Sequence, residues 1–101
     1  MATDKFMSML GFAKRARKIV YGLDSLETAK HIKLLALSDT ASENLTKAIV
    51  RLSQRKNLPL ITVEKLEDKA GGNCKALGIT DENMALEMIK YVKGGAQGYK
   101  I

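Results

Sequence analysis

The sequence predicts a single α/β domain with the three layers of an α/β/α sandwich. Its 101 residues suffice for one buried core, and its content of 46% hydrophobic and 28% charged residues is close to ordinary globular usage. Short apolar runs alternate along the chain with segments of helical periodicity. Because such alternation is typical of βαβ units, we expect a largely parallel sheet covered by helices on both faces.

The N-terminal third is predicted to hold a helix, a short strand and a second, shorter helix. The first helix spans about residues 4–17. Its apolar residues recur at the spacing of one helix face: Phe6, Met9, Leu10 and Ala13. Residues 19–21 form a β-favouring run. Asp24 and Ser25 are both good N-caps for the second helix, which we expect to end near residue 31.

The middle of the chain predicts a buried strand followed by a longer helix. Residues 34–37 are continuously apolar, as expected of a strand that is covered on both faces. Thr40 and Glu43 have the spacing of a capping box, and Ser42 is an alternative N-cap. The helix that follows is expected to stop near Asn57.

The C-terminal part predicts two more strands and two helices. Residues 60–63 and 75–79 are apolar enough for buried strands, and residues 64–70 form a short helical turn between them. Thr80 or Asp81 caps the last helix.

One domain over residues 1–94 and a loosely ordered tail over residues 95–101 are expected. Cys74 is the single cysteine, so no internal disulfide can form and the cytoplasm is the expected compartment. The first residues lack the pattern of a signal peptide, and no apolar stretch is long enough for a membrane span. We therefore expect no membrane association.

The charge balance favours a polyanionic partner. Seventeen Lys and Arg residues against eleven Asp and Glu residues give a net charge of +6. Four of the cations fall within residues 14–18, at the end of the first predicted helix. Stabilisation of the helix dipole, at roughly 0.3–1 kcal/mol for each cation, is one explanation. Because a helix start follows at Gly22, nucleic-acid contact is the interpretation we favour.

Catalytic chemistry is not indicated by the sequence. The glycines around residues 71–73 and 94–98 lack the spacing of a phosphate loop or a dinucleotide fold, and they serve equally well as helix ends. His31 and Cys74 have no base or metal-ligand partner at a suitable spacing. We expect no enzymatic activity, no cofactor and no metal.

The order of motifs resembles the bacterial YlxQ-like branch of the kink-turn-binding ribosomal protein family. The resemblance begins with Leu-Gly-Phe-Ala-Lys-Arg-Ala-Arg-Lys at residues 10–18, Gly22 with its helix, and residues 34–42. It continues through Asn-Leu-Pro at residues 57–59 and through residues 75–81. It implies a sandwich with a four-stranded mixed sheet that binds RNA as a ribosomal or ribosome-associated protein.

Family members bind kink-turns through Gly-x-Asn-Glu-x-x-Lys at the start of the second helix and through an apolar loop. The matching positions of the helix motif are Gly22, Asp24, Ser25 and Thr28, so only the glycine is kept. The loop corresponds to Lys69, Ala70 and Gly71, preceded by Glu67 where the family usually has a small residue.

The segment from residue 22 to residue 39 is about four residues shorter than in typical relatives, close to one helical turn. Lys30 or Lys33 is then a candidate to replace the missing lysine.

A monomeric binder of structured, kink-turn-like RNA is the function we expect. The candidate RNA contacts are Lys14, Arg15, Lys18, Gly22, Asp24, Ser25, Thr28, Lys69, Ala70 and Gly71. One alternative keeps the fold and binds RNA weakly through its charge. Another is a protein-interaction or regulatory module that uses Met84, Met88 and the tail, although helical spacing also fits methionines in a core.

Overall fold

Helices and strands alternate along the chain in the computed structural model, as the sequence predicts. The structure describes residues 2–70, 74–90 and 99–100, with residues 2–6, 69, 70, 90, 99 and 100 described by their backbone only. The elements are α1 (Ala2–Arg15), β1 (Ile19–Tyr21), α2 (Leu23–Thr28), β2 (Leu34–Ser38), α3 (Glu43–Lys56), β3 (Leu60–Val63), α4 (Leu66–Ala70), β4 (Ala76–Ile79), α5 (Glu82–Lys90) and β5 (Tyr99–Lys100).

The sheet is mixed, with strand order β1-β4-β2-β3-β5. Strand β4 runs antiparallel to both β1 and β2, whereas β2 and β3 are parallel. The largely parallel sheet expected from the alternation of elements is therefore wrong, and the mixed sheet implied by the resemblance is confirmed. Alternation of elements does not by itself set strand direction: residues 22–33 connect β1 to β2, which run in the same direction, and an equally long segment, residues 64–75, connects β3 to β4, which run in opposite directions.

Part of the tail, which was expected to be loosely ordered, forms a strand at the far edge of the sheet. Tyr99 and Lys100 form β5, which pairs in parallel with β3. The edge of β3 offers unpaired N–H and C=O groups, and such an edge readily accepts another strand. The remaining tail positions, 95–98 and 101, lie outside the described residues.

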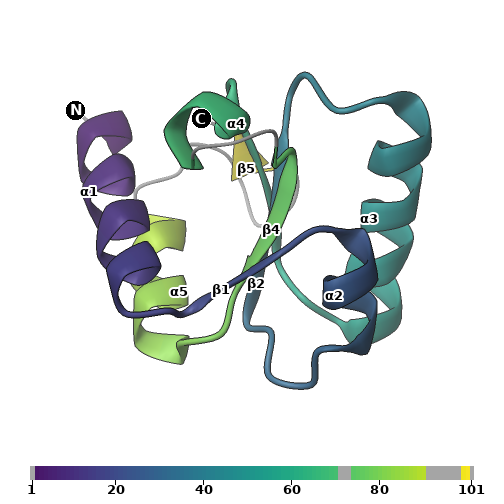
Figure 1. Cartoon of the computed structure of the whole chain (residues 1–101), viewed down its shortest axis with the longest axis horizontal. Coiled ribbons are helices and arrows are strands. Elements are labelled where there is room, and N and C mark those ends of the chain that lie inside the picture. The colour runs from purple at the N-terminus through teal and green to yellow at the C-terminus, as the bar shows by residue number, and fades with distance from the viewer. Residues whose placement is uncertain (1, 71–73, 91–98, 101) are drawn as a thin grey trace.

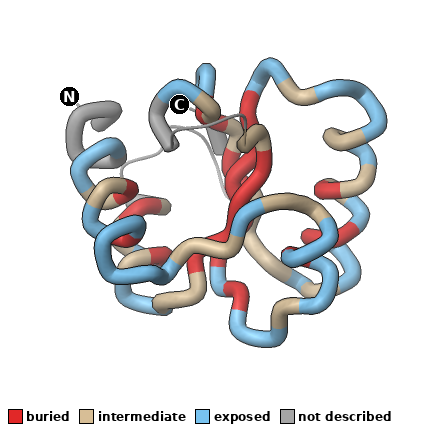
Figure 2. The backbone as a smooth tube through the Cα atoms, viewed as in Figure 1, coloured by how far each residue is buried: buried red, intermediate tan, exposed pale blue. Residues whose placement is uncertain are grey.

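Helices cover both faces of the sheet, which confirms the three-layer sandwich (Figure 1). On one face α1, α4 and α5 pack against the sheet, and on the other face α2 and α3 do so. All five residues of β2 are buried, as the apolar run predicts, and buried residues concentrate in the central strands (Figure 2). Met88 is fully buried and Met84 packs against the core, so core packing is confirmed for both and Met88 is not available to the alternative interaction surface.

Helix ends follow the predicted chemistry in the longer helices. Ser42, the alternative cap, accepts a hydrogen bond from Leu45 N at 3.1 Å and begins α3. Asn57 ends that helix in the left-handed conformation, with φ of 54°. At α5 the Oδ1 atom of Asp81 accepts from Met84 N at 2.9 Å.

Helix α2 differs from its predicted limits at both ends. It starts after Gly22, without a side-chain cap, and ends at Thr28 rather than near residue 31. Asp24 and Ser25 therefore lie inside its first turn instead of capping it. The reason is that Gly22 N donates to Ala76 O in β4 at 3.2 Å, which fixes where the strand stops.

Gly78 in β4 sets the depth at which α2 packs on the sheet. A Cβ atom at this position would lie 2.7 Å from Leu26 Cδ2 and 2.9 Å from Ile32 Cδ1. Both of those side chains are buried. The bare backbone of Gly78 is thus what allows α2 and the following loop to approach β4.

Gly78→Ala should lower the free energy of unfolding by about 1–3 kcal/mol, the usual range for overpacking a core. Gly11→Ala is the matched control, because a Cβ atom there meets nothing within 4 Å. Since Gly11 lies within α1, alanine should stabilise by roughly 0.5–1 kcal/mol. Urea denaturation measures both, and equal effects of the two substitutions would contradict the packing role of Gly78.

Candidate nucleic-acid interface

The first part of the candidate interface is the basic turn, residues 14–18, at the end of α1. Arg17 N donates to Lys14 O at 3.2 Å, and Lys18 N donates to Ala13 O at 2.9 Å. This pair of hydrogen bonds is a Schellman motif, with Arg17 in the left-handed position at φ of 59°. The left-handed conformation costs a residue other than glycine roughly 1–2 kcal/mol. The turn is therefore closely fixed and slightly strained.

Strand β1 connects the basic turn to α2 and is held by β4 at both ends. At one end Thr80 N donates to Lys18 O at 2.9 Å, and at the other Gly22 N donates to Ala76 O. Between them Val20 is the register partner of Gly78. Lys18 and Gly22 are four residues apart, which is about 13 Å of extended strand at 3.3 Å per residue. One short edge strand thus places the basic turn and the start of α2 at a fixed spacing.

Gly22 and the first turn of α2 form the second part of the candidate interface. Gly22 has φ of 87°, and a Cβ atom there would have open space around it. Glycine is needed for the backbone angle and leaves the backbone accessible. Asp24 and Ser25 are exposed beside it, but Thr28 Oγ1 donates back to Ser25 O at 3.2 Å. The hydroxyl of Thr28 therefore serves the end of α2, unlike the lysine expected at this position in the family.

Lys33 lies at the same end of β4 as the basic turn. Its backbone N donates to Ile79 O at 2.7 Å, one residue before Thr80, which binds Lys18. Lys33 is exposed, as are Arg15, Arg17 and Lys18. The loop between α2 and β2 thus places the backbone of Lys33, one of the two lysines named from the sequence, at the same end of β4 as the basic turn. Arg17 was not among the predicted contacts, although the charge count of residues 14–18 includes it.

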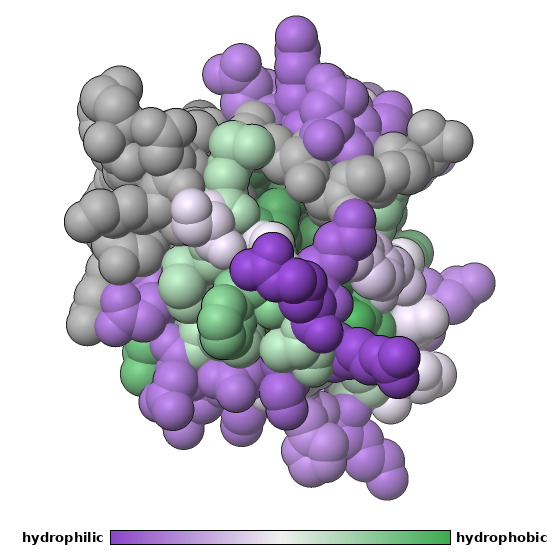
Figure 3. Space-filling view, turned by 60° about the vertical axis from the view of Figure 1, so that its left-hand side comes forward, coloured by the Kyte–Doolittle hydropathy of each residue, from purple (hydrophilic) through white to green (hydrophobic). Residues whose placement is uncertain are grey.

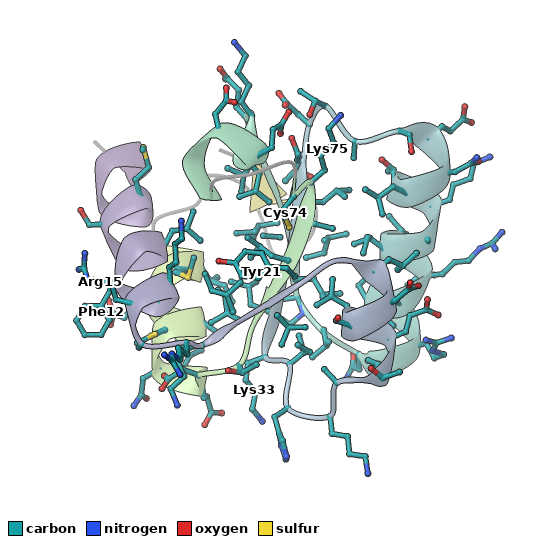
Figure 4. All side chains as sticks on the ribbon, viewed as in Figure 1. Phe12, Arg15, Tyr21, Lys33, Cys74 and Lys75 are labelled. Carbon is teal, nitrogen blue, oxygen red and sulfur yellow. The ribbon has the colours of Figure 1, made fainter. Side chains whose placement is uncertain are left out.

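Polar and apolar side chains alternate on the α1 side of the molecule. In Figure 3, which turns this side forward, strongly hydrophilic side chains lie directly beside apolar ones. Phe12 is 54% exposed at the end of α1, and Tyr21 is 41% exposed at the end of β1. Figure 4 shows Phe12 and Arg15 side by side, pointing away from the sheet. The surface is therefore basic with accessible aromatic rings, a combination that is found in proteins that bind single-stranded nucleic acids.

The predicted loop contacts are only partly placed. Lys69 and Ala70 end α4, but their side chains are not described, and Gly71 lies outside the described residues. The preceding Glu67 accepts hydrogen bonds from Ser38 Oγ and Thr40 Oγ1, each at 2.5 Å. Its carboxylate thus holds α4 to the end of β2.

The hydrogen bond from Ser38, followed in importance by that from Thr40, lowers the pKa of Glu67 to about 2. The positive charge of Lys75 acts in the same direction. Sequence spacing does not reveal this cluster, because Ser38 and Glu67 are 29 residues apart.

Side chains that bind metals are not gathered into a site within residues 2–70, 74–90 and 99–100. No three His, Cys, Asp or Glu residues in these ranges could share a metal ion. Cys74 Sγ donates a hydrogen bond to Ala76 O at 2.8 Å. Partial burial raises the pKa of Tyr21, and the nearby Cys74 adds a smaller effect in the same direction. His31 is exposed. In these same residues no helix has the length and apolar character to span a membrane.

Comparison with known proteins supports the fold class. Neither family models nor curated proteins give a match to this sequence. A solved structure of a protein of unknown function from Bacillus halodurans is similar, with a TM-score of 0.79 and 22% sequence identity. The likeness covers 86% of this chain and 95% of that chain. The fold and this likeness define a three-layer α/β/α sandwich protein, and at this identity they establish the fold alone.

Glu67→Gln should remove an acid-sensitive contribution to stability. The pKa of Glu67 is depressed in the folded protein, so its contribution is complete above the ordinary value near 4.5 and disappears as pH falls through about 2. Between pH 5 and pH 2 the wild type should therefore lose more stability than the variant. Denaturant unfolding across this range tests it, with Glu43→Gln on the exposed side of α3 as the control. Parallel curves for wild type and Glu67→Gln would overturn this assignment.

Proposed function

We propose that this protein binds structured, kink-turn-like RNA without catalysing a reaction. The observation that carries the proposal is the spacing fixed by β1, with the basic turn at one end and the exposed start of α2 at the other. The net charge of +6 and the resemblance to the kink-turn-binding ribosomal proteins support it. A cytoplasmic, ribosomal or ribosome-associated setting belongs to the same proposal.

In this proposal the phosphates of the RNA meet the basic turn. Arg15 and Lys18 are exposed there, and Lys33 adds a third cation beside the end of β4. Contacts of this kind set the position and orientation of the RNA, but they do not select its sequence. Their strength falls with salt, because each neutralised phosphate releases counterions.

Selection among RNAs is assigned to the first turn of α2. Gly22 allows the RNA to approach the backbone, the carboxylate of Asp24 accepts from base amino groups, and the hydroxyl of Ser25 donates or accepts. Thr28 adds little, because its hydroxyl hydrogen is used within the helix. The base contacts are therefore fewer than in typical family members.

A specific observation also favours a second candidate, a charge-driven RNA binder without kink-turn preference. Only Gly22 of the helix motif is kept, and Thr28 is bonded internally. In that case affinity would depend on the basic turn alone. The two candidates differ in whether the RNA bases matter.

Kink-turn RNA should bind more tightly than the same RNA with its G·A pairs replaced. Each good base contact is worth about 1–3 kcal/mol, so a single retained contact gives roughly 5-fold to 150-fold discrimination. Calorimetry at fixed salt and Mg²⁺ measures both affinities. Equal affinities would favour the charge-driven binder, and no binding of either RNA at physiological salt would refute RNA binding altogether.

Arg15→Gln and Lys18→Gln should each weaken binding to both RNAs by a similar factor. Each substitution should also make the slope of log affinity against log salt shallower, by about 0.7–0.9 for every lost phosphate contact. Lys47→Gln and Arg55→Gln are the controls, since these exposed cations lie on α3 on the other side of the sheet. The same loss in the controls would show that net charge, rather than the basic turn, determines binding.

A further inference from the structure

Arg17 occupies a position that its surroundings do not explain. Glycine is the favoured residue at the left-handed end of a Schellman motif, whereas Arg17 adopts φ of 59° there. Its side chain is exposed, and it makes no ion pair or side-chain hydrogen bond with the residues that the structure describes. The two backbone hydrogen bonds of the motif hold the turn, but no side-chain pairing of Arg17 with these residues offsets the strain. Residues held in such conformations are often kept for binding.

Phe12 lies one helical turn before the end of α1 and is also unexplained by the core. More than half of its side chain is exposed, and its carbonyl accepts from Ala16 N at 2.9 Å in the last turn. Arg15 follows three residues later and lies beside it on the helix surface (Figure 4). An accessible ring with the guanidinium group of Arg15 beside it suits a nucleotide better than an apolar peptide, because the phosphate complements the charge.

We propose that Phe12, Arg15 and Arg17 form a second RNA contact that accepts an unpaired nucleotide. The base stacks on the ring of Phe12, and the adjoining phosphates bind the guanidinium groups of Arg15 and Arg17. An unpaired nucleotide is the required occupant, since neighbouring bases cover both faces of a base inside a duplex. This inference rests on the proposed RNA binding and shares Arg15 with it, but it adds Phe12 and Arg17 and uses none of Gly22, Asp24 and Ser25.

The contact is preformed by the same hydrogen bonds that fix the basic turn. The Schellman bonds hold Arg17, and Thr80 holds Lys18 from the other side, through N at 2.9 Å and through Oγ1 at 3.3 Å. Little backbone ordering is then needed on binding. The unpaired nucleotide is thus bound on the α1 side of the molecule, next to the structured RNA that is bound along β1.

A ten-nucleotide oligoadenylate, which cannot form a kink-turn, is the probe. Phe12→Ala should weaken its binding by about tenfold, the effect of losing one base stack. Phe12→Leu should weaken it nearly as much, because leucine keeps an apolar surface but has no aromatic face. Leu86→Ala, which removes an equally exposed side chain from α5, is the matched control and should leave affinity unchanged.

Arg17→Gly separates binding from stability. It should weaken oligoadenylate binding several-fold while raising Tm by about 2–8 °C, because glycine relieves the left-handed strain. Arg17→Lys should keep most of the affinity and the wild-type Tm. A Tm that does not rise for Arg17→Gly would overturn the strain assignment.

The RNA contact itself fails if Phe12→Ala and Arg17→Gly bind oligoadenylate as the wild type does, or if Phe12→Leu keeps full affinity. It also fails if the wild type binds kink-turn RNA but not oligoadenylate, and the proposed function then stands. If oligoadenylate binds as expected but G·A pairs make no difference, the second contact stands and only kink-turn specificity is lost.

Discussion

The fold depends on strand β4, which is hydrogen bonded on both sides and buried on both faces. It pairs antiparallel with β1 and with β2, and all four of its residues are inaccessible to solvent. Its two ends also hold the two ends of β1, through Thr80 to Lys18 and through Ala76 to Gly22. Because Gly78 has no side chain, α2 can pack directly over the middle of the same strand. The spacing and orientation of the candidate interface are therefore consequences of β4.

Left-handed backbone angles occur at both ends of β1 and also at two positions outside the candidate interface, Asn57 and Lys65. Arg17 and Gly22, at the two ends of β1, both have positive φ, and only Gly22 is a residue that adopts it without strain. Elsewhere the polar groups are used for stability, as at Ser38 and Thr40, whose hydroxyls bind Glu67.

The sequence predicts the elements well because their signals are local. The apolar run at residues 34–37 and the caps Ser42, Asn57 and Asp81 all act within a few residues of where they stand. The direction of β4 is not predicted, because two connections of equal length, residues 22–33 and 64–75, join strands that run in the same direction and in opposite directions respectively. The start of α2 was missed as well, since the bond between Gly22 and Ala76 joins residues far apart in the sequence.

The candidate site could be predicted in its charges but not in its geometry. Charge density alone identifies residues 14–18 as a cluster. The position of Lys33 near Lys18 depends on long-range hydrogen bonds to Ile79 and Thr80, whereas the left-handed turn at Arg17 and the bond of Thr28 are local but are not indicated by the residue types at these positions. The Glu67 cluster likewise brings together three elements of the fold.

We propose that RNA binds along β1, from the basic turn to the start of α2. Titration of the labelled protein with kink-turn RNA, followed by the chemical shifts of its backbone amides, tests this directly. The largest shifts should occur at residues 14–18 and at Gly22 and Asp24, while the amides of α3 are unaffected. Shifts centred on α3, or no shifts at saturating RNA, would contradict it.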